Sequence, residues 1–341
     1  MKITEASLAK REKPKNIKKY DEWLFCKEFE KEFISVELSK LSNCYFSPNG
    51  SFLTRWFTRV PGYFNTGLTL KGSIVHGMKD IVSLAKTRRL IKLNNAIIVT
   101  NANSTNFFHW FFDVLPKLEC IADPVFGFAD FIVFVPSNHA APYIYETLSA
   151  FGVQCFFQKD DEFVFFENCT VFPELAPTGN YIKSLIEKQR LRLIKFFRRK
   201  MDFNKAPKRV YITRKSAKYR RLTNEVLIFP VLKEYGFIIV DMDAMPFLDQ
   251  VKLMFDADLL VSLHGAGLSH MLWMKSGGDV FEIRSKGDSH NNCYYSLSSD
   301  LGLNYWYSFA NKLGNKSVQV SDHELDLENF LDVLKKIMSK I

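Results

Sequence analysis

The segment from Arg209 to Arg284 alternates between short apolar runs and amphipathic stretches, and this pattern restricts the possible folds more than any other feature. Runs rich in β-branched and aromatic residues predict strands at 209–213, 237–241, 258–263 and 279–284. Between them, helical periodicity predicts helices at 224–235 and 247–257, with another starting just after 264–267. Gly236 stands where the first helix should end. This order predicts parallel strands with helices on both faces of the sheet.

The preceding part alternates less regularly. It predicts strands at 96–100, 130–135 and 153–157, and helices at 106–121, 140–151 and 180–200. The last of these helices carries one apolar face, formed by Ile182, Leu185, Ile186, Leu193 and Phe197. Residues 20–95 are harder to interpret, with short antiparallel strands expected near 52–60 and 73–76. Residues 322–341 are amphipathic and predict a C-terminal helix.

The length of 341 residues favours two domains. Residues 201–208 contain Asn204 and Pro207, which break the helical pattern, and are expected to be a linker. We therefore expect an N-terminal domain over residues 1–200 and a C-terminal domain over residues 209–341.

Composition excludes some classes of protein. Hydrophobic residues make up 47% of the chain and charged residues 24%, as in folded globular proteins. No apolar run reaches the roughly 18–20 residues that span a bilayer, and the basic first 20 residues lack the apolar region of a secretory signal. Six scattered cysteines form no C-x-x-C pair, which favours reduced thiols over a zinc site. A cytoplasmic protein is expected.

The net charge of +9 is concentrated in one segment. Residues 183–221 contain 16 Lys and Arg but only two acidic residues, Glu187 and Asp202. The segment could bind a phosphate-bearing ligand, an anionic membrane surface or nucleic acid, or it could be a solvated basic helix. Aromatic residues are not interleaved with the basic ones as in single-strand binders, so nucleic acid is the least favoured partner.

The run His109-Trp-Phe-Phe-Asp113 places an imidazole and a carboxylate one turn apart on a predicted helix. Such a pair can act as a general base because each group can orient the other. A structural His–Asp pair on a helix surface is the alternative.

The run Ser262-Leu-His-Gly-Ala-Gly follows a buried strand, at the sheet edge where α/β proteins bind ligands. Gly265 and Gly267 let the backbone approach a ligand, and the following helix directs N–H groups at any anion there. The run lacks the third glycine of a dinucleotide fingerprint and the Lys-Ser/Thr of a phosphate-binding loop. A purely structural turn is the alternative.

Cations gather after the strand at 209–213. Arg214 and Lys215 stand at its carboxyl end, where they could neutralise a diphosphate. The nearby residues Arg220, Arg221, Asn224 and Glu225 form part of the same group, and Glu282 on a later strand could accept the hydroxyls of a ribose. Asp241-Met-Asp243 could hold a divalent metal, although such triplets arise often by chance.

Taken together, these segments resemble glycosyltransferase family 61. The resemblance runs from about residue 95 to 285 through 106–116, Tyr211-Ile-Thr-Arg214, Arg221, Asn224-Glu225, Asp249-Gln250-Val251, His264-Gly-Ala-Gly-Leu268 and Glu282-Ile283. It implies two Rossmann-like domains facing each other across a cleft, the GT-B arrangement, and inverting transfer of a sugar from a nucleotide-sugar without a bound metal or other cofactor.

The resemblance also implies roles for individual residues. Asp113 would be the base and His109 its orienting partner, with the reverse assignment left open. The donor would be held by Arg214, Lys215, Arg221, Asn224, Glu225, His264, Gly265, Ala266, Gly267 and Glu282.

The N-terminal domain would bind a glycan or lipid-linked glycan acceptor during synthesis of a capsular or other surface polysaccharide. The basic segment and the apolar face of 180–200 predict peripheral association with the inner membrane face. The alternatives are a non-catalytic protein that binds nucleotide-sugars or glycans and, less favoured, a nucleic-acid-binding protein.

Overall fold

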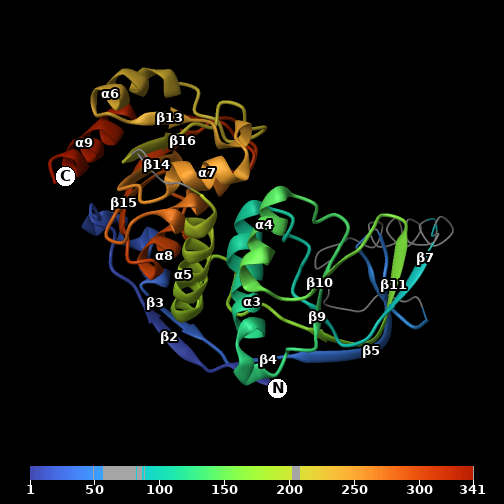
Figure 1. Ribbon diagram of the computed structural model, residues 1–341. Coiled ribbons are helices and arrows are strands. Elements are labelled where there is room, and N and C mark those ends of the chain that lie inside the picture. Colours follow the sequence, from blue (N-terminus) through green and yellow to red (C-terminus); the bar gives the residue numbers. More distant parts are fainter. Residues whose placement is uncertain (49, 57–81, 83–86, 88, 202–207, 341) are drawn as a thin grey trace. The chain divides into compact units, whose positions relative to one another are not determined.

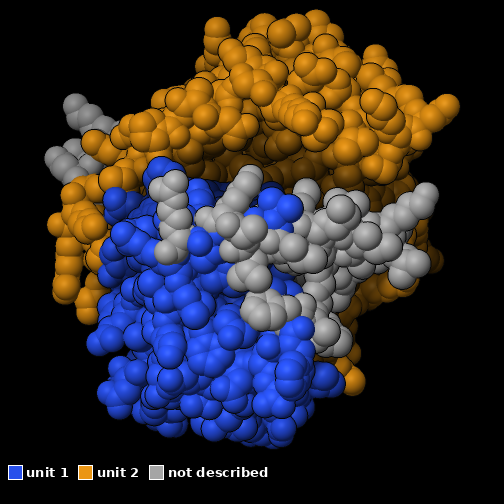
Figure 2. All heavy atoms as spheres, turned by 90° about the vertical axis from the view of Figure 1, so that its right-hand side faces the viewer, with its two compact units in different colours: residues 1–7, 34–176 blue, residues 8–33, 177–341 orange. Residues whose placement is uncertain are grey.

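The structure is a computed structural model that describes residues 1–48, 50–56, 82, 87, 89–201 and 208–340 (Figure 1). The chain forms two compact units, coloured separately in Figure 2. Unit 1 contains residues 1–7 and 34–176, and unit 2 contains residues 8–33 and 177–341. The expected strand at 73–76, the end of the one at 52–60 and most of the linker lie outside the described residues.

Unit 1 is built on a mixed sheet with the order β10-β9-β8-β11-β5-β6, and β7 also pairs with β11. Strands β7 to β11 run parallel, whereas β5 and β6 are antiparallel to their neighbours. The sheet strands are β5 (Ser39–Phe46), β6 (Phe52–Thr54), β7 (Arg89–Leu93), β8 (Ala96–Ile98), β9 (Ile132–Val135), β10 (Cys155–Phe157) and β11 (Glu162–Val171). A separate pair joins β1 (Lys2–Thr4) to β4 (Val36–Glu37).

The helices of unit 1 connect the parallel strands. After β8 the chain forms α2 (Phe107–His109), a π-helical turn η3 (Trp110–Val114), α3 (Leu115–Ala122) and the short turn η4 (Pro124–Phe126). Helix α4 (Pro142–Phe151) connects β9 to β10. The predicted strands and helices between residues 96 and 157 are therefore confirmed, apart from the change of helical pitch at Trp110.

Unit 2 is built on a six-stranded sheet with the order β13-β12-β14-β15-β16-β17, parallel except for the final pair. Its strands are β12 (Arg209–Ile212), β13 (Ile238–Val240), β14 (Leu259–Leu263), β15 (Asp279–Ser285), β16 (Asn304–Lys312) and β17 (His323–Leu325). The helices are α5 (Lys183–Lys200), η5 (Glu225–Ile228), α6 (Phe229–Glu234), η6 (Met242–Ala244), α7 (Phe247–Met254), η7 (Ala266–Trp273), α8 (Cys293–Asp300) and α9 (Leu327–Met338).

Both faces of this sheet are covered, which explains why β14 is buried along its whole length and apolar except for Ser262. Leu259, Val261 and Leu263 share one core with residues of α6 and α9. Elsewhere in unit 2, Phe197 of α5 packs edge-on against Phe247 of α7 and Trp273 of η7. The expectation of an α/β fold with helices on both faces is confirmed here.

The N-terminal segment 8–33 belongs to unit 2. It contains η1 (Lys19–Leu24), η2 (Cys26–Glu28), β3 (Glu30–Phe33) and most of β2 (Ser7–Lys10). The Asn16 side chain donates to the carbonyl of Tyr307 and accepts from its N–H, at 2.8 and 3.1 Å. Phe25 is fully buried between Tyr295, Tyr305 and Tyr307. The segment therefore completes the core of unit 2 beside β16.

Several expectations need revision. The division between the units falls at residue 176, before α5 rather than after it, and unit 2 takes in 8–33. Residues 323–325 of the expected C-terminal helix form β17, because they pair with β16. The apolar face of α5 packs inside the protein, with Ile186, Leu193 and Phe197 buried. None of the helices in the described ranges is both long and apolar enough to cross a bilayer.

Candidate functional site

The strand order of unit 2 points to a position between two particular strands as the expected ligand site. Along the chain, β12 is followed by β13 on one side and β14 on the other, so the connections diverge between β12 and β14. In open α/β sheets, ligands bind at the carboxyl ends of strands at such a point. Arg214 follows β12 and His264 follows β14, as the sequence predicted.

Arg214 is held by backbone carbonyls. Its Nε donates to the carbonyl of Arg220 at 2.9 Å and its Nη2 to that of Tyr219 at 3.0 Å. Burial, followed by the nearby charge of Arg220, lowers the pKa of the Arg214 guanidinium. The charge of Arg220 disfavours the charged form of Arg214, whereas Asp243 and Asp241 favour it, and a bound anion would favour it as well.

Arg220 completes this pair and was missing from the predicted donor-binding residues. Its backbone is left-handed, with φ of 57°, a conformation that costs free energy in a non-glycine residue and often marks functional sites. Its buried Nε has no hydrogen-bond partner. Within the described ranges, neither Arg214 nor Arg220 forms an ion pair with a carboxylate.

Gly265 is required by the close approach of Arg214. A Cβ added at Gly265 would lie 2.3 Å from Nη1 of Arg214 and 2.9 Å from its Cζ. At Gly267, a Cβ would lie 3.1 Å from Cγ2 of Ile212. The glycines therefore let the loop after β14 lie against the arginine and against β12. The helix expected after this loop is present as the 3₁₀ helix η7.

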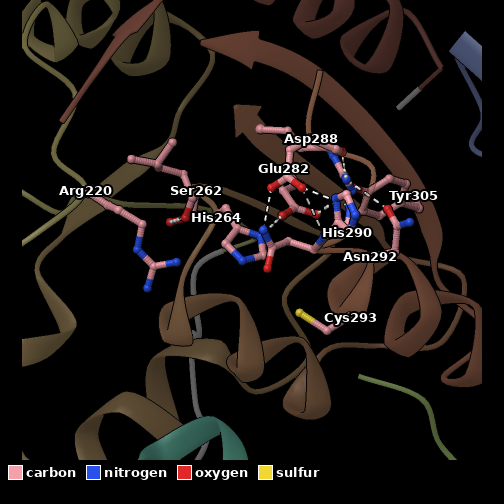
Figure 3. A network of polar contacts seen from close by, with 12 residues as sticks. Arg220, Ser262, His264, Glu282, Asp288, His290, Asn292, Cys293 and Tyr305 are labelled. Atoms are coloured by element: carbon pink, nitrogen blue, oxygen red, sulfur yellow. Dashed lines mark hydrogen bonds and ion pairs between the residues drawn. The ribbon is translucent and has the colours of Figure 1, made fainter. Parts of the chain in front are cut away.

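His264 is oriented by a buried carboxylate (Figure 3). Its Nδ1 lies 2.5 Å from Oε1 of Glu282, which is fully buried, while the His264 side chain is 14% exposed. The Tyr305 hydroxyl donates to Oε2 of Glu282 at 2.5 Å. Because Nδ1 faces Glu282, Nε2 is the ring atom that a ligand can reach.

Glu282 therefore does not fit the expected role of accepting ribose hydroxyls. Both of its oxygens are occupied, and Arg284 lies 3.9 Å from Oε2. Burial alone would lower the pKa of Arg284, but the Tyr305 and Glu282 groups raise it above its ordinary value. Glu282 acts as an internal counter-ion that fixes His264.

Three other predicted residues have structural partners. Arg221 pairs with Asp322, its Nη2 donating to Oδ2 at 2.8 Å. The Asn224 side chain bonds the backbone of Leu325 through both its groups, at 3.0 and 2.8 Å. Glu225 is buried and accepts from the hydroxyls of Tyr211 and Thr213 at 2.7 and 2.6 Å. These contacts hold the loop after β12 in place. The three side chains are engaged within the protein, so other residues of the loop are better placed to contact a ligand.

The remaining predicted residues lie at the same loops. Lys215 is exposed directly after Arg214, and Ala266 is partly exposed between the two glycines. Asp241 accepts from the N–H of Asp243, so it caps the turn η6. The described residues contain no group of three or more His, Cys, Asp and Glu side chains suited to a metal.

The second predicted site lies in unit 1. His109 Nδ1 and Asp113 Oδ2 are 2.7 Å apart, and their side chains are 21% and 5% exposed. Asp113 belongs to the π-helical turn η3, and such turns occur frequently at functional sites. The Asn106 side chain accepts from the N–H of Phe108 and fixes the start of this helical stretch. The structure thus brings the predicted pair into direct contact.

A buried lysine on the same helical stretch escaped the sequence analysis. Lys117, one turn after Asp113, donates to the carbonyl of Val99 and to Glu174, both at 3.1 Å. Asn101 also donates to Glu174, at 2.7 Å. These contacts join the loops after β8 and β11 to the helix that carries Asp113. The signal in the sequence is a lysine on an otherwise apolar face.

Comparison with known proteins gives a family match in the same region. The pattern of the family described as glycosyltransferase 61 matches residues 107–281, just over half of the chain. The match spans both His109–Asp113 and the loops after β12 and β14.

Curated relatives match a shorter stretch. The EGF domain-specific O-linked N-acetylglucosamine transferase of Bos taurus is 31% identical over 102 residues, which cover 28% of this chain and 19% of that protein. The protein of the same name from Drosophila melanogaster is 32% identical over 98 residues, covering 28% and 18%. The chain therefore spans less than a fifth of these relatives.

Proposed function

The chain belongs to the glycosyltransferase 61 family and is a glycosyltransferase, and from that premise we propose how it holds its donor. The diphosphate of a nucleotide-sugar binds at the carboxyl ends of β12 and β14. The observation that carries this proposal is the arginine pair, Arg214 and Arg220, which has no carboxylate partner within the described ranges.

His264 is proposed to act on the leaving group. When the ring carries both protons, Nδ1–H donates to Glu282 and Nε2–H can donate to a phosphate oxygen as the bond to the sugar breaks and negative charge develops on the nucleotide. Arg214, which backbone carbonyls already orient, and Arg220, whose Nη1 donates to the Gln319 side chain at 3.3 Å, stabilise that charge. Lys215 adds an exposed cation at the same edge.

We expect nucleoside diphosphates to raise the melting temperature of the protein, and Arg214→Ala to abolish most of that shift. Loss of a charge-assisted hydrogen bond to phosphate costs about 1.5–3 kcal/mol, or roughly 10–150-fold in affinity. The measurement is a thermal shift with uridine, guanosine, cytidine and thymidine diphosphates.

Arg221→Ala is the matched control, since this arginine is in the same loop but pairs with Asp322. It should retain the shift. The donor site is wrongly placed if both variants lose the shift equally, or if no nucleotide stabilises the unmodified protein.

Transfer is proposed to be inverting, with the acceptor hydroxyl deprotonated by the pair in unit 1. Asp113 takes the proton while His109 holds its carboxylate, and the reverse assignment remains the alternative. This requires the two units to face each other across a cleft, the GT-B arrangement, which is part of the proposal. It is supported by the parallel strands and connecting helices of each unit.

We propose one candidate for the donor sugar and two candidates for the acceptor. The names of the curated relatives favour N-acetylglucosamine as the transferred sugar. The acceptor is a glycan, and we propose a capsular or other surface polysaccharide, built free or on a lipid carrier. A protein hydroxyl, as those names imply for the relatives, is the second candidate.

We propose a cytoplasmic enzyme that associates with the inner membrane face through charge. The apolar face of α5 is buried, but six of its basic residues are exposed: Lys183, Lys188, Lys195, Arg198, Arg199 and Lys200. Each basic residue near an anionic leaflet contributes about 1 kcal/mol to binding. Flotation should show binding to vesicles with 30% phosphatidylserine and release by about 0.5 M salt, because salt screens exposed charges.

Neutral phosphatidylcholine vesicles are the control and should bind little protein. Equal binding to both vesicles, or binding to neither, would exclude this mode of association.

A further inference from the structure

Unit 2 contains a cavity of about 470 Å³ whose lining shares no residue with the loops after β12 and β14. It is lined by β16 (Tyr307 and Phe309), by the N-terminal segment that contains η1, and by α9. This volume lies in the range of small-molecule sites. Lys286, which lines the cavity, follows the carboxyl end of β15. This end lies at the same edge of the sheet as His264.

Two aromatic side chains line the cavity while remaining open to solvent. Trp23 is 55% exposed and Tyr20 is 67% exposed. Two hydrogen bonds to the rest of unit 2 hold the turn that carries them. Asp21 accepts from the Tyr307 hydroxyl at 2.8 Å, and the carbonyl of Leu24 accepts from Asn292 at 2.9 Å. Large rings held outward on a fixed turn form a preorganised stacking surface.

The charges around the cavity balance. Three lysines, Lys18, Lys286 and Lys336, stand against three aspartates, Asp21, Asp326 and Asp332. Asp332 pairs with Lys336 at 2.7 Å, and Asp326 caps the start of α9. The lining therefore offers hydrogen-bond donors and acceptors together with little net charge. Uncharged hydroxyl groups suit such a lining because each can both donate and accept, whereas a phosphate would find no net positive charge there.

We propose that this cavity binds an uncharged saccharide whose sugar ring stacks on Trp23. The C–H face of a pyranose carries partial positive charge and is attracted to the negative face of an aromatic ring. The neighbouring lysine and aspartate groups bind its hydroxyls. The inference deepens the proposed function, on which it rests for its substrate class: it assigns a second contact for the acceptor glycan, away from the transfer site.

The test is saturation-transfer NMR on the full chain without donor, using N-acetylchitotriose, cellotetraose, maltotetraose and mannobiose as probes. At least one of these saccharides should bind. Trp23→Ala should raise the dissociation constant of that saccharide about tenfold, which corresponds to about 1.4 kcal/mol of binding free energy. Trp23→Phe keeps an aromatic ring and should retain most of the binding. Trp56→Ala is the matched control, since Trp56 is 73% exposed and lies in unit 1.

Binding that is unchanged in Trp23→Ala, or absent for all four probes, would overturn the proposal. Loss of uridine diphosphate binding in Trp23→Ala would identify the cavity as a nucleotide site instead. Arg214→Ala should leave saccharide binding intact. Failure of the donor-site proposal would appear in the thermal shift, independently of the NMR result.

Discussion

Replacement of Asp113 by Asn is expected to lower the rate of sugar transfer by about 10²–10⁴-fold, the usual contribution of a general base. Asparagine keeps the shape of the side chain and can still contact His109, which lies 2.7 Å away. It cannot accept the proton of the attacking hydroxyl. The measurement is the rate of nucleotide release with the donor and acceptor that the unmodified protein uses fastest.

Donor binding should be nearly unchanged, because the proposed donor-binding residues are in unit 2. The thermal shift with nucleoside diphosphate should therefore persist in Asp113→Asn. Asp130→Asn, an exposed position in the same unit, is the control and should transfer at the normal rate. If Asp113→Asn remains active while His109→Ala is inactive, the roles are reversed. If both remain active, the pair is structural.

Replacement of Glu282 by Leu is expected to destabilise unit 2 by about 3–5 kcal/mol, the cost of removing one partner of a buried ion pair. Glu282 is fully buried and Arg284 is 2% exposed, so the guanidinium would lose its nearest carboxylate without gaining water. The Tyr305 hydroxyl and His264 would lose their acceptor as well. Urea unfolding followed by circular dichroism measures the change.

The double variant Glu282→Leu, Arg284→Met removes both charges and should recover much of the lost stability. The single variant Arg284→Met is measured as well. If the double variant loses as much stability as the two single variants added together, the carboxylate does not act as a counter-ion to Arg284. Tryptophan fluorescence can report the same transition, because Trp273 and Trp306 are buried in unit 2.

The sequence predicted the sheet of unit 2 best where short apolar runs stand between helical stretches. Strands β12 to β14 fall within the predicted ranges, and β15 extends one residue beyond its range, to Ser285. Strand β16 escaped prediction. Its Tyr305 and Tyr307 form hydrogen bonds that join the core to Glu282 and Asp21, and these distant partners cannot be read from the local sequence. The role of residues 8–33 in unit 2 depends on contacts nearly 300 positions away, which local patterns cannot reveal.

For the candidate site, the sequence identified the loops better than the side chains that can bind a ligand. Arg214, His264 and Gly265 lie together as expected, because the carboxyl ends of neighbouring parallel strands meet at one edge. Arg220 and Arg221 could not be told apart from the sequence. The left-handed backbone at Arg220 sets which arginine approaches Arg214 and which one pairs with Asp322.

The course of the chain through the units has a consequence for how such enzymes can diversify. The polypeptide passes from unit 1 to unit 2 after Ser7, returns after Phe33 and leaves again after Ala176. A gene fragment that begins at Pro177 would encode β16 without Asn16, which binds the Tyr307 backbone, and without Phe25. An unpaired strand edge of this kind promotes aggregation. Recombination between relatives must therefore exchange two separated stretches of coding sequence together to transfer an intact unit 2.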